Sequence, residues 1–279
     1  ENMAVVVPLL LLLGLATGLG SATVARGVLE PVRSFKLISF DLDDTLWPTG
    51  PVVLAANSAL AQAVGGCPDD LQKRLREARS RTTPPPSYSE ARILAVESWM
   101  CESAGFSPGS CRTEAEQMFD LWLSERHAAA SRLLFDGAAT AIAEARRLHP
   151  DAAVAAITNG RGDPLAMPDL AALFDFTISA ESARIYPNRK PAREPFLAAL
   201  RLAGCEARPS EWAHVGDDLI NDVQASRALG AWAIWLAPPP KQSGAAPDAA
   251  AAAASSPDDA VGDSFWFSTM SDEERQARR

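Results

Sequence analysis

Three carboxylates follow one short apolar stretch early in the chain. In KLISFDLDDTLW, residues 36–47, the stretch 37–40 runs directly into Asp41, Asp43 and Asp44. Like charges held this close disfavour ionisation of one another unless a cation lies among them. Mg²⁺ is bound in proteins by one or two carboxylates together with water and phosphate oxygens. The three carboxylates therefore predict a Mg²⁺ site. Asp41 and Asp43 point to the same side of an extended backbone, so these two carboxylates could act together on one substrate.

Further polar residues occur where other expected strands end. They are hydroxyl, amide, lysine and carboxylate groups with two glycines: Thr158, Asn159, Gly160, Lys190, Gly216, Asp217, Asp218 and Asp222. Ligands of parallel sheets bind beyond the carboxyl ends of the strands, where such residues converge. A Gly-Asp-Asp turn alone is weak evidence, since an Asp at a helix start also caps helix N–H groups. The joint set, in this order, indicates one site.

These residue types suit the transfer of a phosphoryl group. Asp41 would attack phosphorus to form an aspartyl-phosphate. Asp43 would protonate the leaving oxygen and then deprotonate a water molecule. Charge gathers on the equatorial phosphoryl oxygens in the transition state, and hydrogen-bond donors stabilise it there. The residues expected to bind these oxygens are Thr158, Asn159, Gly160 and Lys190.

The elements that position these residues alternate along the chain. After a first strand at 36–40, apolar runs of strand character alternate with helical spacing. The expected strands are 152–160, 176–180, 211–218 and 231–237, and the expected helices are 137–148, 168–174, 193–204 and 219–230. This alternation calls for a parallel sheet with helices on both faces. We therefore expect an α/β fold with a Rossmann-like parallel sheet.

A stretch with helical spacing only follows the first strand. From Val52 to His127 apolar residues recur in four segments, separated by GGCPDD, TTPPPS and GFSPGS. These breaks are rich in Gly, Pro and Ser, which interrupt helices. The pattern predicts an all-helical insertion, residues 51–131, into a core made of residues 34–50 and 132–238.

Both ends of the chain differ in composition from this part. Residues 3–25 carry no charge and are long enough to contact or span a bilayer. We expect residues 1–33 to be a targeting or membrane-anchor segment, with a buried core helix and a misassigned start as alternatives. The protein would then be organelle-targeted, by the plastid or secretory route, or membrane-anchored. Residues 239–279, rich in Ala, Pro, Ser and Asp, are expected to form a low-complexity tail.

Charge and cysteine content restrict the classes of partner. The net charge of −9 argues against nonspecific nucleic-acid binding, which needs a basic face. A small phosphorylated metabolite remains compatible with a locally positive site, and we expect a monomer or homodimer. Cys67, Cys101, Cys111 and Cys205 show neither CxxC spacing nor a cluster with His. The prediction for them is free thiols in a reducing compartment.

The motifs FDLDDTL, ITNG, KP and HVGDDLINDV together resemble those of the haloacid dehalogenase superfamily of phosphatases. The resemblance spans residues 36–236, and the helical insertion resembles the type 1 cap of that superfamily. It implies Asp41 as the nucleophile and Asp43 as the general acid and base. It also implies phosphate binding by Thr158 and stabilisation of the phosphoaspartate by Lys190.

The same resemblance implies how Mg²⁺ is held. The metal ligands would be Asp41, Asp217 and the backbone carbonyl of Asp43. Asp222 is the usual second acidic position, acting through water or Lys190, and Asp218 stands at a position that is often Ser in relatives. His214, within an expected strand, is interpreted as a structural partner and not as a base.

The core motifs FDLDDTLW, VAAITNGRGDP and HVGDDLINDVQASRALGAWAIWL are similar to a bacterial branch of the superfamily. That branch acts on FMN and on 5-amino-6-(5-phosphoribitylamino)uracil, a riboflavin precursor. The cap resembles it weakly, so the reaction class transfers better than the substrate. The alternatives are a sugar-phosphate or phosphoglycolate phosphatase, a phosphomutase, a haloacid dehalogenase and a catalytically silent binding protein.

Overall fold

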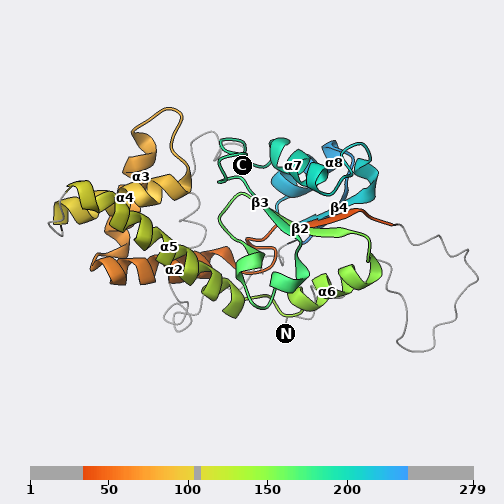
Figure 1. The fold of residues 1–279 in the computed structure, drawn as a ribbon, viewed down its shortest axis with the longest axis horizontal. Helices are drawn as coiled ribbons and strands as arrows, with labels where there is room; N and C mark the ends of the chain where they lie inside the picture. The colour runs from red at the N-terminus through yellow and green to blue at the C-terminus, as the bar shows by residue number, and fades with distance from the viewer. Residues whose placement is uncertain (1–33, 104–107, 238–279) are drawn as a thin grey trace, which may run out of the picture. The chain divides into compact units, whose positions relative to one another are not determined.

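The computed structural model describes residues 34–103 and 108–237, which divide into two compact units (Figure 1). One unit contains residues 34–46 and 134–237, and the other contains the described part of residues 47–133. The expected targeting segment, 1–33, and the expected tail, 239–279, lie outside the described residues. Among the helices that are described, none is both long enough and apolar enough to cross a membrane.

The first unit is built on a five-stranded sheet in which all pairings are parallel. Its strands, in the order β3-β2-β1-β4-β5, have short apolar sequences. Their bounds are β1 (Leu37–Phe40), β2 (Ala153–Thr158), β3 (Phe176–Ser179), β4 (Trp212–Gly216) and β5 (Trp232–Trp235). The central place of β1 puts Asp41 between the carboxyl ends of β2 and β4. The predicted α/β fold with a parallel sheet is confirmed.

Helices cover both faces of this sheet. Figure 1 shows α6 (Ala138–Leu148) on one side, and α7 (Glu194–Leu202) and α8 (Ala225–Ala228) on the other. Side chains alternate between the two faces along a strand. Leu37 packs with Phe196 of α7 in the buried cluster of that side. Two-residue alternation therefore carries Leu37, residue 39 and Asp41 toward the α7 side.

Two expected helices of the first unit have a different form. The expected helix 168–174 is replaced by a short 3₁₀ turn, η2 (Ala171–Leu173). Two further 3₁₀ turns are η1 (Pro164–Ala166), which precedes it, and η3 (Pro209–Glu211), which precedes β4. The expected helix 219–230 begins as the π-helical segment η4 (Leu219–Gln224) and continues as α8. A π-helical hydrogen bond joins the Val223 N–H to the Asp218 carbonyl at 3.2 Å. π-Helical turns occur often at functional sites, and this one contains Asp222.

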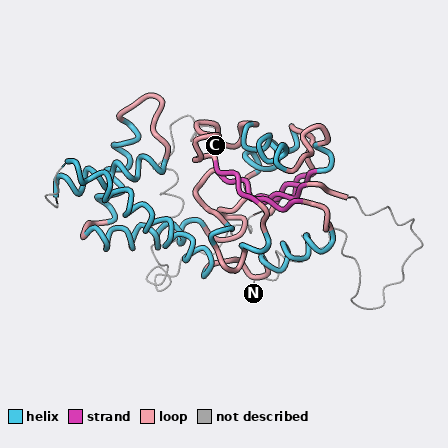
Figure 2. Tube along the Cα trace, viewed as in Figure 1, coloured by secondary structure: helices cyan, strands magenta, loops and turns pink. Residues whose placement is uncertain are grey.

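The second unit is all-helical, as predicted. It consists of α2 (Thr49–Val64), α3 (Pro68–Ser80), α4 (Tyr88–Ser103) and α5 (Pro108–Arg132), in cyan in Figure 2. α5 packs against α2 and α4, and α3 packs against α4. The buried cluster includes Leu60 of α2, Val96 of α4 and Trp122 of α5. The helical spacing of apolar residues in the sequence therefore corresponds to the buried faces of these helices.

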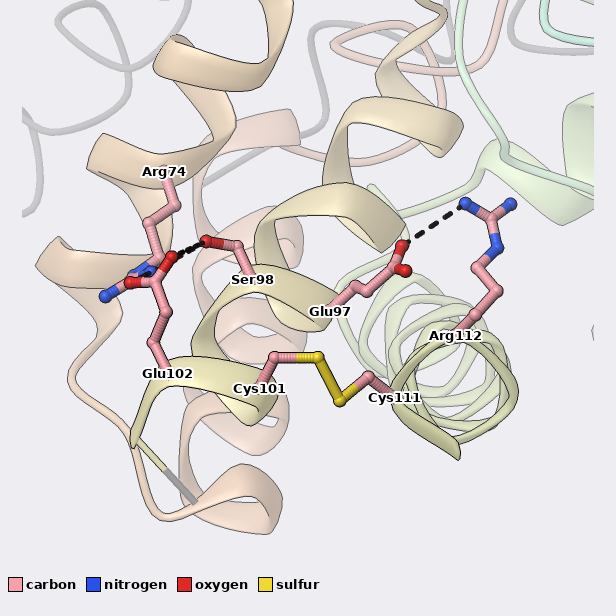
Figure 3. The surroundings of a disulfide bond; sticks show 7 residues. All are labelled: Arg74, Glu97, Ser98, Cys101, Glu102, Cys111 and Arg112. Atoms are coloured by element: carbon pink, nitrogen blue, oxygen red, sulfur yellow. Dashed lines mark hydrogen bonds and ion pairs between the residues drawn. A yellow bond between two sulfur atoms is a disulfide. The ribbon is translucent and has the colours of Figure 1, made fainter. Parts of the chain in front are cut away.

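A disulfide joins two helices of this unit. Cys101 of α4 and Cys111 of α5 are bonded, with their Cα atoms 5.9 Å apart (Figure 3). The prediction of four free thiols was wrong for this pair, whereas Cys67 and Cys205 are free, one exposed and one buried. The disulfide could not be predicted from the sequence because it depends on the packing of α4 against α5. A separation of ten residues matches no cysteine motif.

Reduction of this disulfide is expected to lower the free energy of unfolding by about 2–3 kcal/mol, because the unfolded chain regains the freedom of a closed loop. Urea unfolding with and without dithiothreitol measures the effect. The double variant Cys101→Ser/Cys111→Ser should lose the response to dithiothreitol, whereas Cys67→Ser, the matched control at an exposed free thiol, should keep it. Equal stability of the oxidised protein and the double variant would contradict the expectation.

Candidate active site

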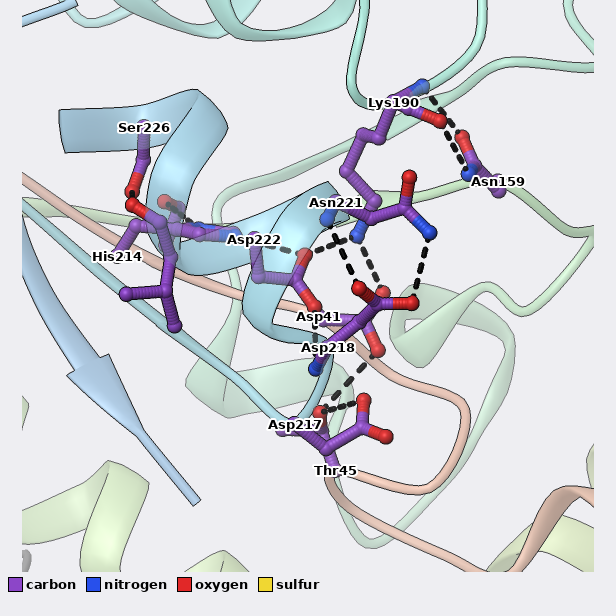
Figure 4. Close-up of polar contacts among 12 residues, drawn as sticks. Asp41, Thr45, Asn159, Lys190, His214, Asp217, Asp218, Asn221, Asp222 and Ser226 are labelled. Atoms are coloured by element: carbon purple, nitrogen blue, oxygen red, sulfur yellow. Dashed lines mark hydrogen bonds and ion pairs between the residues drawn. The ribbon is translucent and has the colours of Figure 1, made fainter. Parts of the chain in front are cut away.

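Several of the polar residues singled out in the sequence meet at one edge of the sheet of the first unit, namely Asp41, Asn159, Lys190, Asp217 and Asp222 (Figure 4). Asp41 follows β1, Thr158 ends β2 and Asp217 follows β4. The Asp41 N–H donates to the Val215 carbonyl at 2.8 Å, so the strand pairing of β1 with β4 continues to the site itself. The hydrogen bonding of the sheet thus fixes the backbone position from which the Asp41 side chain extends.

Lys190 connects two of the carboxylates. Its Nζ donates to Oδ1 of Asp41 at 2.5 Å and to Oδ1 of Asp222 at 2.6 Å. The Lys190 side chain is only 2% exposed, and the two partners are 9% and 2% exposed. Burial by itself would lower the pKa of Lys190, but the carboxylates of Asp222 and Asp41 outweigh it and raise the pKa. Lys190 is therefore a permanent ammonium group within the site.

Three carboxylates exceed the charge of this one lysine. Ligand oxygens of Asp41, Asp217 and Asp222 lie within 4.8 Å of one another. Burial, together with the carboxylates of Asp222 and Asp217, raises the pKa of Asp41 against the effect of Lys190. Burial and the neighbouring carboxylates also raise the pKa of Asp217 to about 7. A cluster of oxygen donors with excess negative charge is a suitable site for a divalent cation such as Mg²⁺.

Asp222 differs from the other two carboxylates. Burial opposes its ionisation, but Lys190 and a hydrogen bond from His214 outweigh burial and lower the pKa of Asp222. Its Oδ2 accepts the N–H of Asp218 at 3.2 Å. Both oxygens of Asp222 thus accept hydrogen bonds from protein donors. These contacts fix the Asp222 carboxylate, which in turn positions the Lys190 ammonium group.

Thr45, in the turn after β1, is a further residue of the site. Its hydroxyl lies 3.1 Å from Oδ2 of Asp41 and 3.3 Å from Oδ1 of Asp217. It is buried, and its single proton is shared between two carboxylates that repel each other. The four-residue spacing from Asp41 was the available signal, because the turn after β1 folds back and brings the two side chains together.

The Thr-Asn-Gly segment reaches the site in an unexpected way. Oγ1 of Thr158 accepts the N–H of Gly160 at 2.9 Å, so the turn closes on the hydroxyl. The Asn159 amide binds the backbone of Lys190 twice: its Oδ1 accepts the Lys190 N–H at 2.8 Å and its Nδ2 donates to the Lys190 carbonyl at 3.0 Å. The Asn159 side chain therefore holds the lysine in place. In addition, Nη2 of Arg189 donates to the Asn159 carbonyl at 3.2 Å.

Asp43 and Asp218 are not part of the three-carboxylate cluster of Asp41, Asp217 and Asp222. Asp43 is half-buried, whereas Asp41 is buried. Asp218 is the N-cap of η4, and its Oδ1 accepts the N–H groups of Ile220 and Asn221, each at 2.9 Å. Helix capping was the alternative interpretation of the Gly-Asp-Asp turn in the sequence, and Asp218 adopts it.

Comparison with known proteins identifies the family of this arrangement. The haloacid dehalogenase-like hydrolase family matches residues 35–230. The chain belongs to this family. The match includes every residue of the site, from Asp41 after β1 to Asp222 in η4.

Curated relatives cover most of the chain at low identity. The chain is 30% identical over 224 residues to the 5-amino-6-(5-phospho-D-ribitylamino)uracil phosphatase YigB of Escherichia coli, covering 75% of this chain and 86% of the relative. It is 29% identical over 217 residues to haloacid dehalogenase-like hydrolase domain-containing protein 3 of Xenopus laevis, covering 74% and 85%. These identities support a shared fold and hydrolase class.

A solved relative carries another activity in its name. A 2-haloacid dehalogenase from Pseudomonas syringae is 31% identical, with a TM-score of 0.59, covering 72% of this chain and 86% of that one. A relative named as a phosphatase and one named as a dehalogenase therefore have almost the same identity to this chain. The choice between these chemistries depends on the site residues of this chain.

The raised pKa of Asp217 predicts how the stability of the metal-free protein depends on pH. Between 3.8, the ordinary value, and about 7, folded Asp217 retains a proton that the unfolded chain has released. The free energy of unfolding should therefore fall as pH rises through this window, and Asp41, whose pKa is also raised, acts in the same direction.

Thermal unfolding in EDTA from pH 5 to 7.5 tests this expectation. The melting temperature of Asp217→Asn should decline less steeply with pH than that of the wild type. Saturating Mg²⁺ should flatten the wild-type dependence, because the metal favours the ionised carboxylates. Parallel slopes for the two proteins in EDTA would show that Asp217 does not titrate in this window.

Proposed function

We propose that the protein is a Mg²⁺-dependent phosphomonoesterase that acts on a small organic phosphate through an aspartyl-phosphate. The observation that carries the proposal is the buried Lys190 ammonium, held between Asp41 and Asp222 and next to Asp217. This pairs a carboxylate nucleophile with a fixed positive charge. Anionic phosphoryl oxygens approaching Asp41 need such a charge, since the carboxylates of Asp41, Asp217 and Asp222 would otherwise repel them.

The chain's own residues supply the covalent steps. Thr45 and Lys190 each bind one oxygen of Asp41, so the plane of the carboxylate is fixed before substrate arrives. In the first step an Asp41 oxygen forms a bond to phosphorus, the ester P–O bond breaks, and Asp43 donates its proton to the leaving oxygen. In the second step Asp43 takes a proton from water, whose oxygen attacks phosphorus and releases Asp41 and inorganic phosphate.

The residues present fit a bound Mg²⁺. Asp41, Asp217 and the backbone carbonyl of Asp43 would hold it, and Thr45 would keep the two carboxylates close together. When bound, Mg²⁺ neutralises the excess carboxylate charge and the charge of the phosphoryl group. Lys190 is the protein's own cation, bound to Oδ1 of Asp41.

The substrate we favour is FMN or a phosphorylated riboflavin precursor. Support comes from the similarity to the E. coli phosphatase, which extends over three quarters of this chain. Phosphoglycolate, sugar phosphates and a phosphomutase reaction are alternatives with the same first step, because each transfers a phosphoryl group to a carboxylate.

A haloacid dehalogenase is the second candidate, favoured by the Pseudomonas relative. That reaction also begins with a carboxylate attack, on carbon instead of phosphorus. A departing halide needs no proton, however, whereas a departing alkoxide does. The presence of Asp43 two residues after Asp41 therefore favours the phosphatase.

Activity on a panel of substrates tests the proposal. The full chain should hydrolyse p-nitrophenyl phosphate with Mg²⁺ and not in EDTA, and should release no chloride from 2-chloropropionate. Comparison of kcat/KM for FMN, the phosphoribitylamino-uracil, phosphoglycolate and sugar phosphates identifies the substrate class. Full activity in EDTA would exclude the metal-dependent mechanism, and FMN no better than generic esters would exclude the flavin assignment.

A further inference from the structure

A series of hydrogen bonds between buried side chains connects the centre of the sheet to Lys190. Nε1 of Trp212 lies 2.7 Å from Oγ of Ser39, which lies 2.7 Å from Nδ1 of His214. Nε2 of His214 lies 3.1 Å from Oδ1 of Asp222, the oxygen that also accepts Nζ of Lys190 at 2.6 Å. Three of these side chains come from neighbouring strands, because Ser39 of β1 pairs in register with His214 of β4.

The chemistry of the donors gives this series a direction. An indole N–H only donates, so Ser39 accepts from Trp212. The remaining Ser39 proton has two acceptors, Nδ1 of His214 at 2.7 Å and the Ala213 carbonyl at the longer distance of 3.4 Å. With Nδ1 accepting from Ser39, a neutral imidazole carries its proton on Nε2, facing Asp222. The arrangement therefore selects the tautomer that donates to the carboxylate.

Close packing around Asp222 and His214 holds the two side chains in contact. A Cβ on Gly216 would lie 2.4 Å from Cγ of Asp222, so only glycine allows the carboxylate to pack against the end of β4. His214 itself is 1% exposed and meets the ring of Phe196 edge-on, with centroids 5.4 Å apart. The imidazole is thus held by ring packing, and the carboxylate by the close backbone at Gly216 together with its hydrogen bonds.

We propose that His214 is a positioning residue, which orients Asp222 and through it the ammonium of Lys190 toward Asp41. It does not touch the reacting atoms. The inference rests on the proposed function only in that Lys190 acts in the reaction. His214 and Lys190 both hold Oδ1 of Asp222, so loss of the His214 donor leaves the carboxylate less constrained, and it can turn away from the geometry that holds the ammonium on Asp41.

Two variants of matched size test the role. His214→Leu removes the donor, and kcat for p-nitrophenyl phosphate should fall about 10- to 100-fold, as for other residues that orient active-site ligands. KM and the Mg²⁺ concentration for half-maximal activity should stay unchanged, because the lost interaction matters in the transition state. His214→Gln keeps an N–H donor at similar reach and should recover most of kcat. Both variants lose the ring contact with Phe196, so general damage to the core affects them equally.

Equal kcat values in the two variants, either both low or both at the wild-type level, would overturn the proposal. A rise in the Mg²⁺ requirement with unchanged kcat would also overturn it. ¹⁵N NMR of the wild-type imidazole provides a measurement that needs no activity: Nε2 should carry the proton, and a proton on Nδ1 alone would contradict the inference. A wild-type protein inactive on every phosphate ester would refute the proposed function instead, and the NMR result would still decide the role of His214.

Discussion

Asp41→Asn is expected to lower kcat for phosphate esters by about 10⁴-fold or more, the scale seen when a covalent nucleophile is removed. An amide is nearly the same size as a carboxylate, so the variant should fold. It offers a neutral oxygen to phosphorus, and that oxygen is a far weaker nucleophile. Steady-state hydrolysis of p-nitrophenyl phosphate measures the loss, and acid-quenched mass spectrometry should show a phosphorylated protein for the wild type only.

Stability is expected to change in the opposite direction. Burial and two neighbouring carboxylates make ionised Asp41 unfavourable in the metal-free protein. Asp41→Asn removes one of these repelling charges and leaves Asp222 to pair with Lys190. The melting temperature in EDTA should therefore rise while activity disappears. This combination separates a chemical role from a structural one.

Asp44→Asn is the matched control for this experiment. It removes a carboxylate from the same turn, and Asn tolerates the left-handed backbone that Asp44 adopts, with φ of 63°. Asp44 is exposed, so the variant should retain wild-type kcat within a small factor. A similar loss in Asp44→Asn and Asp41→Asn would point to the total charge of the turn and would refute Asp41 as the nucleophile.

The sequence predicted the architecture well because its signals are local. Short apolar runs followed by polar turns mark parallel strands, and the ends of β1, β2 and β4 carry residues of the site. Asp41, Thr158 and Asp217 converge since the sheet places β1 between β2 and β4. Lys190 could be placed by motif only, because it lies in a loop whose path the hydrophobic pattern does not encode.

What escaped the sequence depends on contacts between distant segments. The two hydrogen bonds of Asn159 to Lys190 require the loop after β3 to return beside β2. The link from His214 to Asp222 requires the π-helical start of the helix after β4. No spacing rule signals either contact. Sequence patterns therefore identify the reacting groups more readily than the residues that hold them in position.

Lys190→Met is the second change with a large expected effect, and it should damage both stability and activity. Removing one partner from a buried ion pair costs about 3–5 kcal/mol, because the carboxylates left behind are buried without a counter-charge. Those carboxylates are Asp41 and Asp222, both almost fully buried. Loss of a fixed donor to the phosphoryl group should lower kcat by roughly 10³-fold. Urea unfolding in EDTA and hydrolysis assays with Mg²⁺ measure the two effects.

The double variant Lys190→Met/Asp222→Asn distinguishes the two roles of the lysine. Replacing Asp222 by a neutral amide removes one uncompensated charge, so a large part of the stability lost in Lys190→Met should return. Activity should not return, because the cation beside Asp41 is still missing. Mg²⁺ should likewise raise the melting temperature of Lys190→Met by binding the uncompensated carboxylates, again with little gain in kcat. Recovery of activity together with stability would mean that Lys190 serves only to neutralise the carboxylates, and that the phosphoryl group is stabilised elsewhere.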